Sequence, residues 1–546
     1  MDREELHRKI KLLEKKLQEG KIHIAAHLAD GFRESLDKVR FLSDGLVDPN
    51  TVDGRIRAMC NFIAYQNDRD EWKEAVSLNK IQEAYFQRVE YAFGQLYDMM
   101  VKAKVDPYRF AGWFSSLEEQ VNNAIPVFDE FIEELSAFWK DISEPTWIHL
   151  EDAFNSKAVF GGEVFPDGTS NLVSSTGLYF DTTILPDPFI KIAPLLTMMS
   201  KEEKCYELVR LALQVLSYKS LVLANTDRPI VAILPDRYHF DEGYKKFVTS
   251  CAESDALSHA NHIFDKNLAS LEDAHSFLRE FSSAEQLVGN LKRPSELVFA
   301  TEWGADPVKQ LKRYISEEAT KVGMKAPGDA VFMQLYSRFT QANDIYQRSM
   351  QLRGTPIIRA ETSWLWYNWM LRYNSNTRLD GALKELHISR ALSTTVKTEF
   401  TWLGNIPSDA LIEIRKSGAL AEIREILGKG IKEIIDATPD RFYRTGDQVF
   451  DNLQKAFSDH EHRLKELRSK KWSFAGKDIG SFMVVGGIEI AAAITGLPLY
   501  GVLASTAGMT GAIPTVKELK DKFKQLKAEE VSIRNTGVGM LFKHKK

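Results

Sequence analysis

Residues 479–516 are the most constraining feature of this 546-residue chain, because Glu489 is the only charged residue among them. About 20 consecutive apolar residues are enough for one helix to cross the hydrocarbon core of a membrane. Gly496, Leu497 and Pro498 interrupt the stretch near its middle, and glycine and proline both disfavour a continuous helix. The sequence therefore predicts a C-terminal apolar helical hairpin, made of two modest helices joined by a tight turn.

Small residues recur along this stretch and would let two helix backbones approach closely, as they do in membranes. A lone carboxylate at mid-membrane costs about 2.5 to 3.5 kcal/mol on insertion scales, which favours insertion on demand over permanent residence. The alternative is that the hairpin is the buried centre of a large folded domain, since each half is shorter than a standard span. The residues that we expect to contact the membrane are Phe482, Val484, Val485, Ile488, Glu489, Ile490, Ile494, Leu497, Leu499, Tyr500, Val502 and Leu503.

Basic residues flank the stretch on both sides, as the positive-inside rule expects for a hairpin with both ends in the cytosol. Each cation close to an anionic membrane surface contributes roughly 1 kcal/mol of attraction. We therefore expect a cytoplasmic protein that lies at, or inserts into, the inner face of a membrane. The residues that we expect to contact anionic lipid are Arg468, Lys470, Lys471, Lys477, Lys517, Lys520, Lys522 and Lys524.

The composition excludes several other classes of protein. With 44% apolar and 27% charged residues, the chain can build packed cores and is not of the disordered class. Three cysteines, Cys60, Cys205 and Cys251, are too few and too widely spaced for a disulfide scaffold, which favours a reducing compartment. The net charge of −5 gives no bulk reason to expect nucleic-acid binding, and the charged N-terminus does not resemble a signal peptide.

Apolar residues spaced by three and four predict helices over most of the chain, with stripes at 78–99 and 114–138. Pro126 lies inside the second stripe, where we expect it to kink or split the helix. The chain is thus expected to be a mostly helical, multi-domain protein. The expected domains are an N-terminal helical bundle at 1–150, a mixed α/β core at 151–375, a helical domain at 376–470 and the hairpin with its basic flanks at 471–546.

The α/β core rests on short apolar runs rich in β-branched residues. Strands are predicted at 178–185 and 229–235, with a helix at 201–223 between them, which is the pattern of a βαβ unit. Two weaker strands are predicted at 297–301 and 355–361. The sequence therefore predicts a small core of parallel strands embedded in the helical protein.

Acidic residues lie within or just after these strands, where open parallel sheets place their sites. Several converging carboxylates could hold Mg²⁺ or Mn²⁺ for phosphodiester hydrolysis. The run YFDTTIL at 179–185 resembles the opening strand of PIN-type nucleases, an apolar strand with Asp followed by Thr, and the resemblance covers that strand alone. The alternative is that the acids beside prolines are turn residues, and no metal or other cofactor is then expected. The weak catalytic candidates are Asp181, Asp187, Asp236, Glu302 and Glu361.

Aromatic residues concentrate at 363–373, in the run SWLWYNWMLRY. Trp366, Trp369 and Tyr373 share one helical face, which could stack on nucleic-acid bases or another ligand. Aromatic stripes of this spacing more often form core, and that is the interpretation we favour.

The function that this architecture favours is membrane association or perturbation through the hairpin, in the manner of a toxin-like or defence effector. Membrane lipid is the expected partner, with a protein partner or self-assembly in addition. The first alternative is a metal-dependent nuclease or other hydrolase centred on the α/β core, with nucleic acid as its partner. The second is a non-catalytic scaffold that binds proteins. Walker-type phosphate loops and GxSxG elbows are absent from the sequence, so the chain is expected to be a non-enzyme unless the nuclease hypothesis holds.

Overall fold

The computed structural model describes residues 3–167, 172–373 and 406–430, together with isolated positions and short runs between 388 and 540. Helices dominate these residues and one small parallel sheet lies among them. The prediction of a mostly helical protein with an embedded α/β core is therefore confirmed. The predicted hairpin at 479–516 lies outside the described residues. The chain divides into two compact units, Met1–Arg88 with Glu134–Phe154, and Val89–Glu133 with Asn155–Lys546.

The first unit is entirely helical. Leu6 and Ile10 pack with Ile56 and Cys60 at the centre of its core. Asp53 caps the third helix, because its carboxylate accepts a hydrogen bond of 2.9 Å from the backbone N–H of Ile56. The elements of this unit are α1 (Arg3–Gln18), α2 (Ala26–Asp37), the 3-10 helix η1 (Pro49–Thr51), α3 (Gly54–Ala75) and parts of α4 (Leu78–Ala103) and α6 (Glu118–Glu151).

Helix α6 runs past Pro126 without a break, so of the two predicted outcomes, a kink or a split, the split does not occur. Pro126 is exposed, and the carbonyl that its ring leaves without a donor therefore lies on the solvent side. On the other face, Phe128 and Phe131 are buried against Phe93 of α4, with ring centroids 4.6 and 5.1 Å apart. Burial of these aromatic rings offsets the roughly 3 kcal/mol that an internal proline costs.

Four parallel strands form the sheet of the second unit, in the order β3-β2-β1-β4. All of their residues are buried, as expected for a parallel sheet covered on both faces. Val159 in β1 pairs with Ile184 on one side and with Pro356 in the edge strand β4 on the other, and an edge strand tolerates proline. The strands are β1 (Lys157–Phe160), β2 (Thr182–Pro186), β3 (Val231–Leu234) and β4 (Thr355–Ile357).

The predicted strands at 178–185, 229–235 and 355–361 overlap β2, β3 and β4. The prediction of a strand at 297–301 is wrong. There the backbone N–H of Phe299 donates to the side-chain oxygen of Gln310 at 2.8 Å, so a side chain satisfies a group that a neighbouring strand would otherwise pair.

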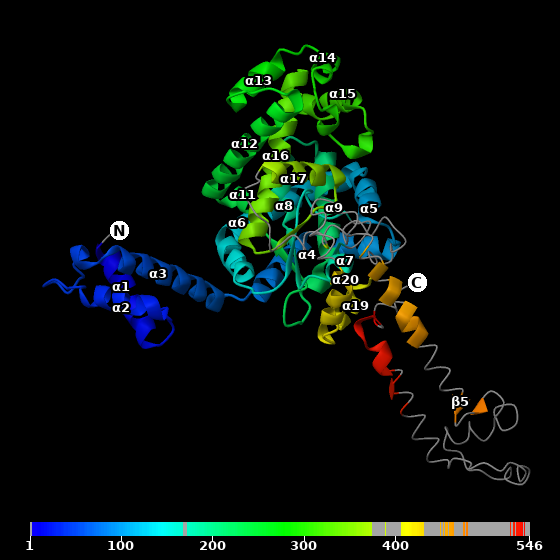
Figure 1. Ribbon diagram of the computed structural model, residues 1–546. Helices are drawn as coiled ribbons and strands as arrows, with labels where there is room; N and C mark the ends of the chain where they lie inside the picture. Colours follow the sequence, from blue (N-terminus) through cyan, green and yellow to red (C-terminus); the bar gives the residue numbers. More distant parts are fainter. Residues whose placement is uncertain are drawn as a thin grey trace, which may run out of the picture. The chain divides into compact units, whose positions relative to one another are not determined.

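Helices cover the sheet and form a second helical mass, which is drawn in green in Figure 1 and centred on α12 and α16. The remaining elements of the second unit are α5 (Pro107–Ser115), α7 (Leu172–Thr176), α8 (Pro188–Leu196), α9 (Lys201–Ser217), α10 (Lys219–Val222), α11 (Arg237–Phe240), α12 (Glu242–Phe264), α13 (Leu271–Arg279), α14 (Ala284–Gly289), η2 (Pro294–Glu296), η3 (Thr301–Trp303), α15 (Pro307–Glu317), η4 (Ala319–Val322), α16 (Pro327–Gln351), α17 (Glu361–Tyr373), α19 (Ser408–Lys416), α20 (Leu420–Gly428), β5 (Ser473–Phe474) and β6 (Lys477–Asp478).

The aromatic run at 363–373 forms α17 and lies in the core, as favoured from its spacing. Trp366 and Trp369 are buried against His259, with ring centroids 5.1 and 4.9 Å away. The indole N–H of Trp366 donates to the carbonyl of Val298 at 3.1 Å. Burial lowers the pKa of His259 to about 3, so its imidazole is neutral at neutral pH and packs as part of the core.

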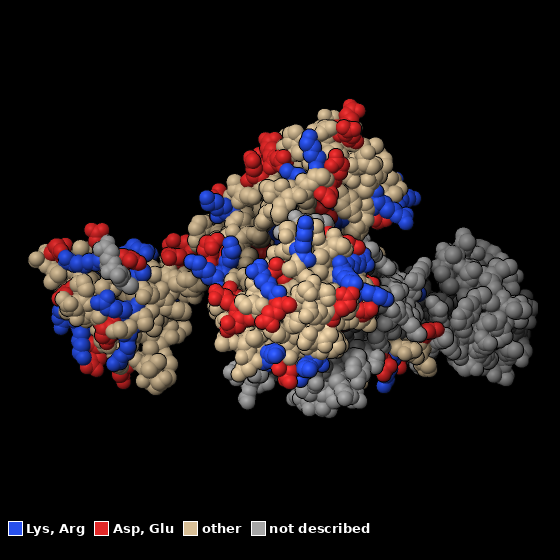
Figure 2. Space-filling model, turned by 90° about the horizontal axis from the view of Figure 1, so that it is seen from above, with Lys and Arg blue, Asp and Glu red and all other residues tan. Residues whose placement is uncertain are grey.

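Charged side chains of both signs lie interspersed on the described surface that faces the viewer in Figure 2. This mixture agrees with the small net charge of −5. On this face the distribution resembles an ordinary protein surface more than the one-signed surface that steers nucleic acid.

Candidate functional site

The strand order reverses direction between β1 and β4, and doubly wound proteins bind ligands beside such a point, at the carboxyl ends of the strands. Gly161 and Gly162 follow β1 there, and Gly162 has a φ of +83°. The side chain of Ile345 packs directly over Gly161, and the Ser363 hydroxyl donates to the Gly162 carbonyl at 2.7 Å. Packing therefore fills this position, and the charged groups gather beyond the neighbouring strands.

Asp187 and Asp236 follow β2 and β3 at this carboxyl edge, and both are buried. Asp187 accepts a hydrogen bond of 2.8 Å from the backbone N–H of Phe189, at the start of α8. Asp236 accepts one of 3.0 Å from the backbone N–H of Tyr238, at the start of α11. Each carboxylate is thus the N-cap of a helix, which is a structural role that agrees with the turn interpretation.

The other two carboxyl-edge candidates are placed apart from these caps. Glu302 is exposed in η3, and Glu361 is the first residue of α17. Within the described part of the chain, no group of three or more His, Cys, Asp or Glu side chains is arranged to hold a metal ion. These residues therefore do not fit a Mg²⁺ or Mn²⁺ site, and we derive no reaction step through a metal.

A group of buried charges that the sequence did not predict lies at the same edge. Asp344 and Arg348 of α16 form an ion pair of 3.3 Å, and both are buried. The Tyr244 hydroxyl donates to Asp344 at 3.0 Å, and the Lys191 ammonium donates to the carbonyl of Glu163 at 2.9 Å. We refer to Lys191, Asp236, Tyr244, Asp344 and Arg348 as the carboxyl-edge cluster.

The pKa values of the carboxyl-edge cluster show how closely its charges depend on one another. Burial, together with the neighbouring Asp236, raises the pKa of Asp344 despite the attraction of Arg348. Burial opposes the charge of Arg348, but Asp344 and Asp236 outweigh it and raise the pKa of Arg348. Burial and the charge of Arg348 lower the pKa of Lys191. Cations and carboxylates thus face one another within the fold at this edge, and the protonation of each depends on its neighbours.

Asp181 lies at the opposite, amino edge of the sheet, directly before β2. Its carboxylate is 2.9 Å from Arg228, 2.9 Å from Arg424 and 3.6 Å from Arg415. It also accepts a hydrogen bond of 3.0 Å from the backbone N–H of Ser156. We refer to Arg228, Arg415 and Arg424 as the arginine triad. Sequence reasoning missed it, because its members come from three segments that only the fold brings together.

The arginine triad determines the protonation of Asp181. Burial alone would raise the pKa of Asp181, but the Ser156 N–H and the charges of Arg424 and Arg228 lower it below its ordinary value. Burial, helped by repulsion from Arg424 and Arg228, lowers the pKa of Arg415 to about 10. Arg415 is thus still cationic at neutral pH. Arg415 of α19 donates to the Gly177 carbonyl at 2.9 Å, and Arg424 of α20 donates to the Ser156 hydroxyl at 2.8 Å. These bonds hold both helices against the segments that lead into β2 and β1.

Two segments that flank the apolar stretch lie against α20. The backbone N–H of Gly537 donates to the Glu422 carboxylate at 2.7 Å, and a Cβ at position 537 would come within 2.8 Å of the Ala419 carbonyl. On the other flank His460 is buried, and burial together with Arg463 lowers its pKa while Glu422 raises it. Figure 1 shows these flanking segments in orange and red beside the yellow α20.

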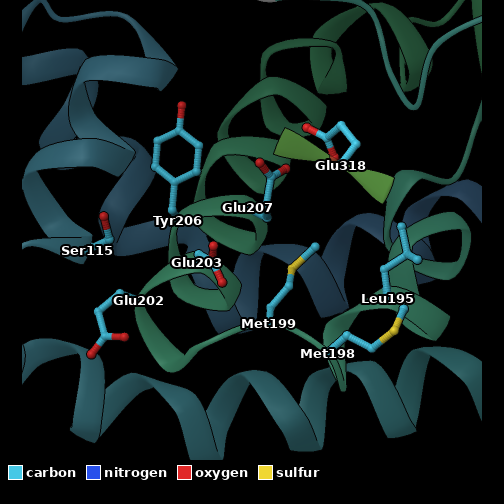
Figure 3. Close-up of a pocket in the computed structure, with 9 residues that line it drawn as sticks. All are labelled: Ser115, Leu195, Met198, Met199, Glu202, Glu203, Tyr206, Glu207 and Glu318. Atoms are coloured by element: carbon cyan, nitrogen blue, oxygen red, sulfur yellow. The ribbon is translucent and has the colours of Figure 1, made fainter. Parts of the chain in front are cut away.

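A pocket of about 810 Å³ lies elsewhere in the second unit, between residues of α5, α8, α9 and the end of α15 (Figure 3). Four glutamates in its lining make it unfavourable for an anionic ligand. None of the catalytic candidates lines it. The lining residues are Ser115, Leu195, Met198, Met199, Glu202, Glu203, Tyr206, Glu207 and Glu318.

The predicted membrane-contacting residues, from Phe482 to Leu503, lie outside the described residues. Lys477 lies in the short strand β6. Among the residues that the structure does describe, no helix combines the length and the apolar character that a membrane span requires. The other predicted lipid-contacting residues also lie outside the described residues, namely Arg468, Lys470, Lys471, Lys517, Lys520, Lys522 and Lys524.

These features define a mostly helical protein around a small doubly wound α/β core, with an ion network at each edge of its sheet. No protein-family model matches the chain, and no curated protein and no solved structure is similar to it at a significant level.

Proposed function

We propose that this protein associates with or perturbs a membrane through residues 479–516, whose flanking segments contact α20 on both sides. The observation that carries the proposal is a pair of hydrogen bonds: the Asn452 amide donates to the carbonyl of Lys429, directly after α20, at 2.8 Å, and the backbone N–H of Gly537 donates to the Glu422 carboxylate of α20 at 2.7 Å. A segment that leaves and returns at one place agrees with entry into a membrane as a hairpin. This agrees with Gly496 and Pro498 near the middle of the stretch.

The free energy expected for transfer of residues 479–516 into a membrane also supports a membrane role. Burying apolar side chains contributes about 25 cal/mol per Å², and the stretch offers many of them against the single charge of Glu489. The basic flanks add electrostatic attraction to anionic lipid. Glu489 provides the opposing cost, so we expect a sheltered state and a membrane state of comparable free energy. A protein of this kind would act as a toxin-like or defence effector, alone or after self-assembly.

The test is flotation of the full chain with vesicles of phosphatidylcholine and phosphatidylglycerol. We expect wild-type protein to float, and Val484→Lys with Leu503→Lys to abolish flotation, because each lysine costs about 2.5 to 3.5 kcal/mol in the membrane. Tyr91→Lys is the matched control, since Tyr91 is a 91% exposed aromatic residue of α4, and it should float normally. Flotation of the double lysine variant at the wild-type level would contradict the proposal.

Glu489→Leu separates simple insertion from pore formation. Removal of the charge should favour insertion by about 2 to 3 kcal/mol and so increase vesicle binding. If Glu489 lines a pore between assembled chains, binding should persist while release of a trapped dye falls. A change in melting temperature alone, with neither protein binding vesicles, would exclude the membrane function.

The metal-dependent nuclease remains a hypothesis from the sequence. The described geometry places Asp181 at one edge of the sheet, and Asp187 and Asp236 at the other. The test is cleavage of single- and double-stranded nucleic acid with Mg²⁺ or Mn²⁺, by wild-type protein and by Asp181→Asn. Metal-dependent cleavage that this substitution abolishes would favour the nuclease over the membrane function. The protein-binding scaffold likewise stays a hypothesis.

A further inference from the structure

The amino edge of the sheet carries more positive charge than its one carboxylate neutralises. Among the described residues, the charged groups that act on Arg415 are Asp181, Arg424 and Arg228. Three guanidiniums thus face one carboxylate, which leaves two positive charges in surplus. Arg228 and Arg424 are 55% and 30% exposed, so water solvates them in part, whereas Arg415 is buried. Like charges held this close repel one another, and an anion bound among them would reduce that repulsion.

Arg415 provides a second, independent observation. Its side chain is only 9% exposed, yet its Nε has no hydrogen-bond partner among the described residues. A buried donor without an acceptor is itself unfavourable. One terminal nitrogen of the same guanidinium, Nη2, already donates to the carbonyls of Gly177 and Phe180, so the position of the guanidinium is fixed. A ligand that displaces the packing over Nε would supply the missing acceptor.

We propose that the arginine triad binds a phosphate group carried as a phosphomonoester, either on a soluble molecule or on a lipid headgroup. A phosphomonoester near neutral pH carries close to two negative charges, which matches the surplus. Guanidinium groups bind phosphate oxygens with paired N–H donors in a fixed planar geometry. Arg228, with a side chain 55% exposed, and the partly exposed Arg424 give a ligand access from solvent.

Asp181 would set the strength of this binding. Its carboxylate occupies donors of Arg228 and Arg424 that a phosphate could otherwise use. It also repels an incoming anion, while it holds the three arginines close enough together to meet one ligand. The site is therefore expected to bind with modest affinity in the wild-type protein and more tightly when this carboxylate is neutral.

The position of the site has a consequence for the rest of the chain. Arg415 and Arg424 belong to α19 and α20, and the flanking segments contact α20 or the residue directly after it through Gly537 and Asn452. A phosphate bound to the arginine triad would thus act on the helix that contacts the segments on either side of the apolar stretch. The phosphate site does not depend on the membrane proposal, because its charges lie wholly within the described residues.

The experiment is titration calorimetry of the full chain at low ionic strength, with inorganic phosphate and glycerol 3-phosphate as probes. Arg228→Gln should weaken binding about tenfold through loss of one charge-assisted contact. Arg313→Gln is the matched control, because Arg313 is also about half exposed and pairs with a single carboxylate, Glu317, so its binding should be unchanged. Asp181→Asn should bind several-fold more tightly, which a purely structural role for Asp181 would not produce.

A second arm identifies the source of the phosphate. Vesicles of phosphatidylcholine with phosphatidic acid carry a phosphomonoester, whereas phosphatidylglycerol presents a diester at equal surface charge. Weaker binding of Arg228→Gln to the phosphatidic acid vesicles alone would support a lipid headgroup, and an effect with the soluble probes alone would support a soluble ligand. If wild-type protein binds none of these probes, or if Arg228→Gln and Arg313→Gln bind them equally, the proposal is wrong. Neither result would bear on flotation through residues 479–516.

Discussion

The two edges of the same sheet differ in how their charged side chains are paired. At the carboxyl edge, the cations Lys191 and Arg348 face the carboxylates Asp236 and Asp344 within the fold. At the amino edge, three arginines surround Asp181 alone. Charges of both signs meet within the fold at the carboxyl edge, and the protonation of each depends there on its partners. The excess of positive charge at the amino edge is where a bound anion can lower the free energy of the folded protein. In the sequence, both groups look like scattered charges. The structure distinguishes a structural cluster at the carboxyl edge from a candidate binding site at the amino edge.

The largest expected effect on the free energy of unfolding comes from a substitution at the carboxyl edge. Arg348→Ala removes a guanidinium whose residue is only 3% exposed and leaves Asp344 and Asp236 buried without it. Loss of one partner from a buried pair costs about 3 to 5 kcal/mol, measured as the free energy of unfolding in urea. Arg313→Ala breaks an exposed pair on α15 and should cost less than about 1 kcal/mol. Equal costs for the two variants would contradict the distinction between structural and surface charges.

The next effect is at the amino edge. Asp181→Asn removes the charge that binds the arginine triad, and we expect a loss of about 2 kcal/mol, typical of charge-assisted hydrogen bonds. Because the folded pKa of Asp181 is lowered, its contribution is present above the unfolded pKa of about 4 and disappears as the pH falls through the folded value. The variant should therefore lose less stability than wild type as the pH falls below about 4. Parallel pH profiles for the two proteins would contradict this assignment.

The carboxyl edge should show the opposite dependence on pH. The folded pKa of Asp344 is raised, so its contribution is present below the unfolded pKa of about 4 and disappears as the pH rises through the folded value. The free energy of unfolding should therefore fall as the pH rises, and Asp344→Asn should reduce that fall. For one proton the reduction is at most about 1.4 kcal/mol per pH unit. Urea unfolding at several pH values measures how the free energy of unfolding depends on pH. Asp329→Asn is the control, because the pKa of Asp329 is lowered and its removal should change that dependence in the opposite direction.

The smallest effect concerns the exposed member of the arginine triad. Arg228→Gln should change the free energy of unfolding by less than about 1 kcal/mol, because half-exposed ion pairs contribute little. The same substitution is expected to weaken phosphate binding clearly, so stability and binding separate at this residue. A loss of stability as large as that of Arg348→Ala would instead make the amino edge a structural network like the other one.

The sequence predicted the helical architecture and three of the strands, because hydrophobic periodicity and β-branched runs report local structure directly. It failed at 297–301, where the side chain of Gln310 replaces a neighbouring strand. It also left open whether Pro126 would kink or split its helix, and the structure excludes the split, because Pro126 is exposed. Both depend on tertiary contacts that no local pattern contains.

The candidate sites were less accessible to prediction. Asp181, Asp187 and Asp236 could be found from their positions beside strands, but the helix-capping roles of Asp187 and Asp236 depend on the helices that follow. Arg228, Arg415 and Arg424 carry no motif, and they are separated by up to almost 200 positions in the chain. For the carboxyl-edge cluster, the one available signal was a pair of opposite charges four residues apart on one predicted helix, Asp344 and Arg348.

The pairing of β1 with β4 has a consequence for how the protein folds. Between them lie most of the described helices of the second unit, and the ammonium of Lys157 in β1 donates to the carbonyl of Leu352, 195 positions away. Contacts so distant in sequence slow folding, because the chain must order the intervening segment before the contact can form. During synthesis β1 must therefore wait, with one edge unpaired, until residues 355–357 have been made. In that interval the nascent chain is prone to aggregation through this edge and is expected to depend on chaperones.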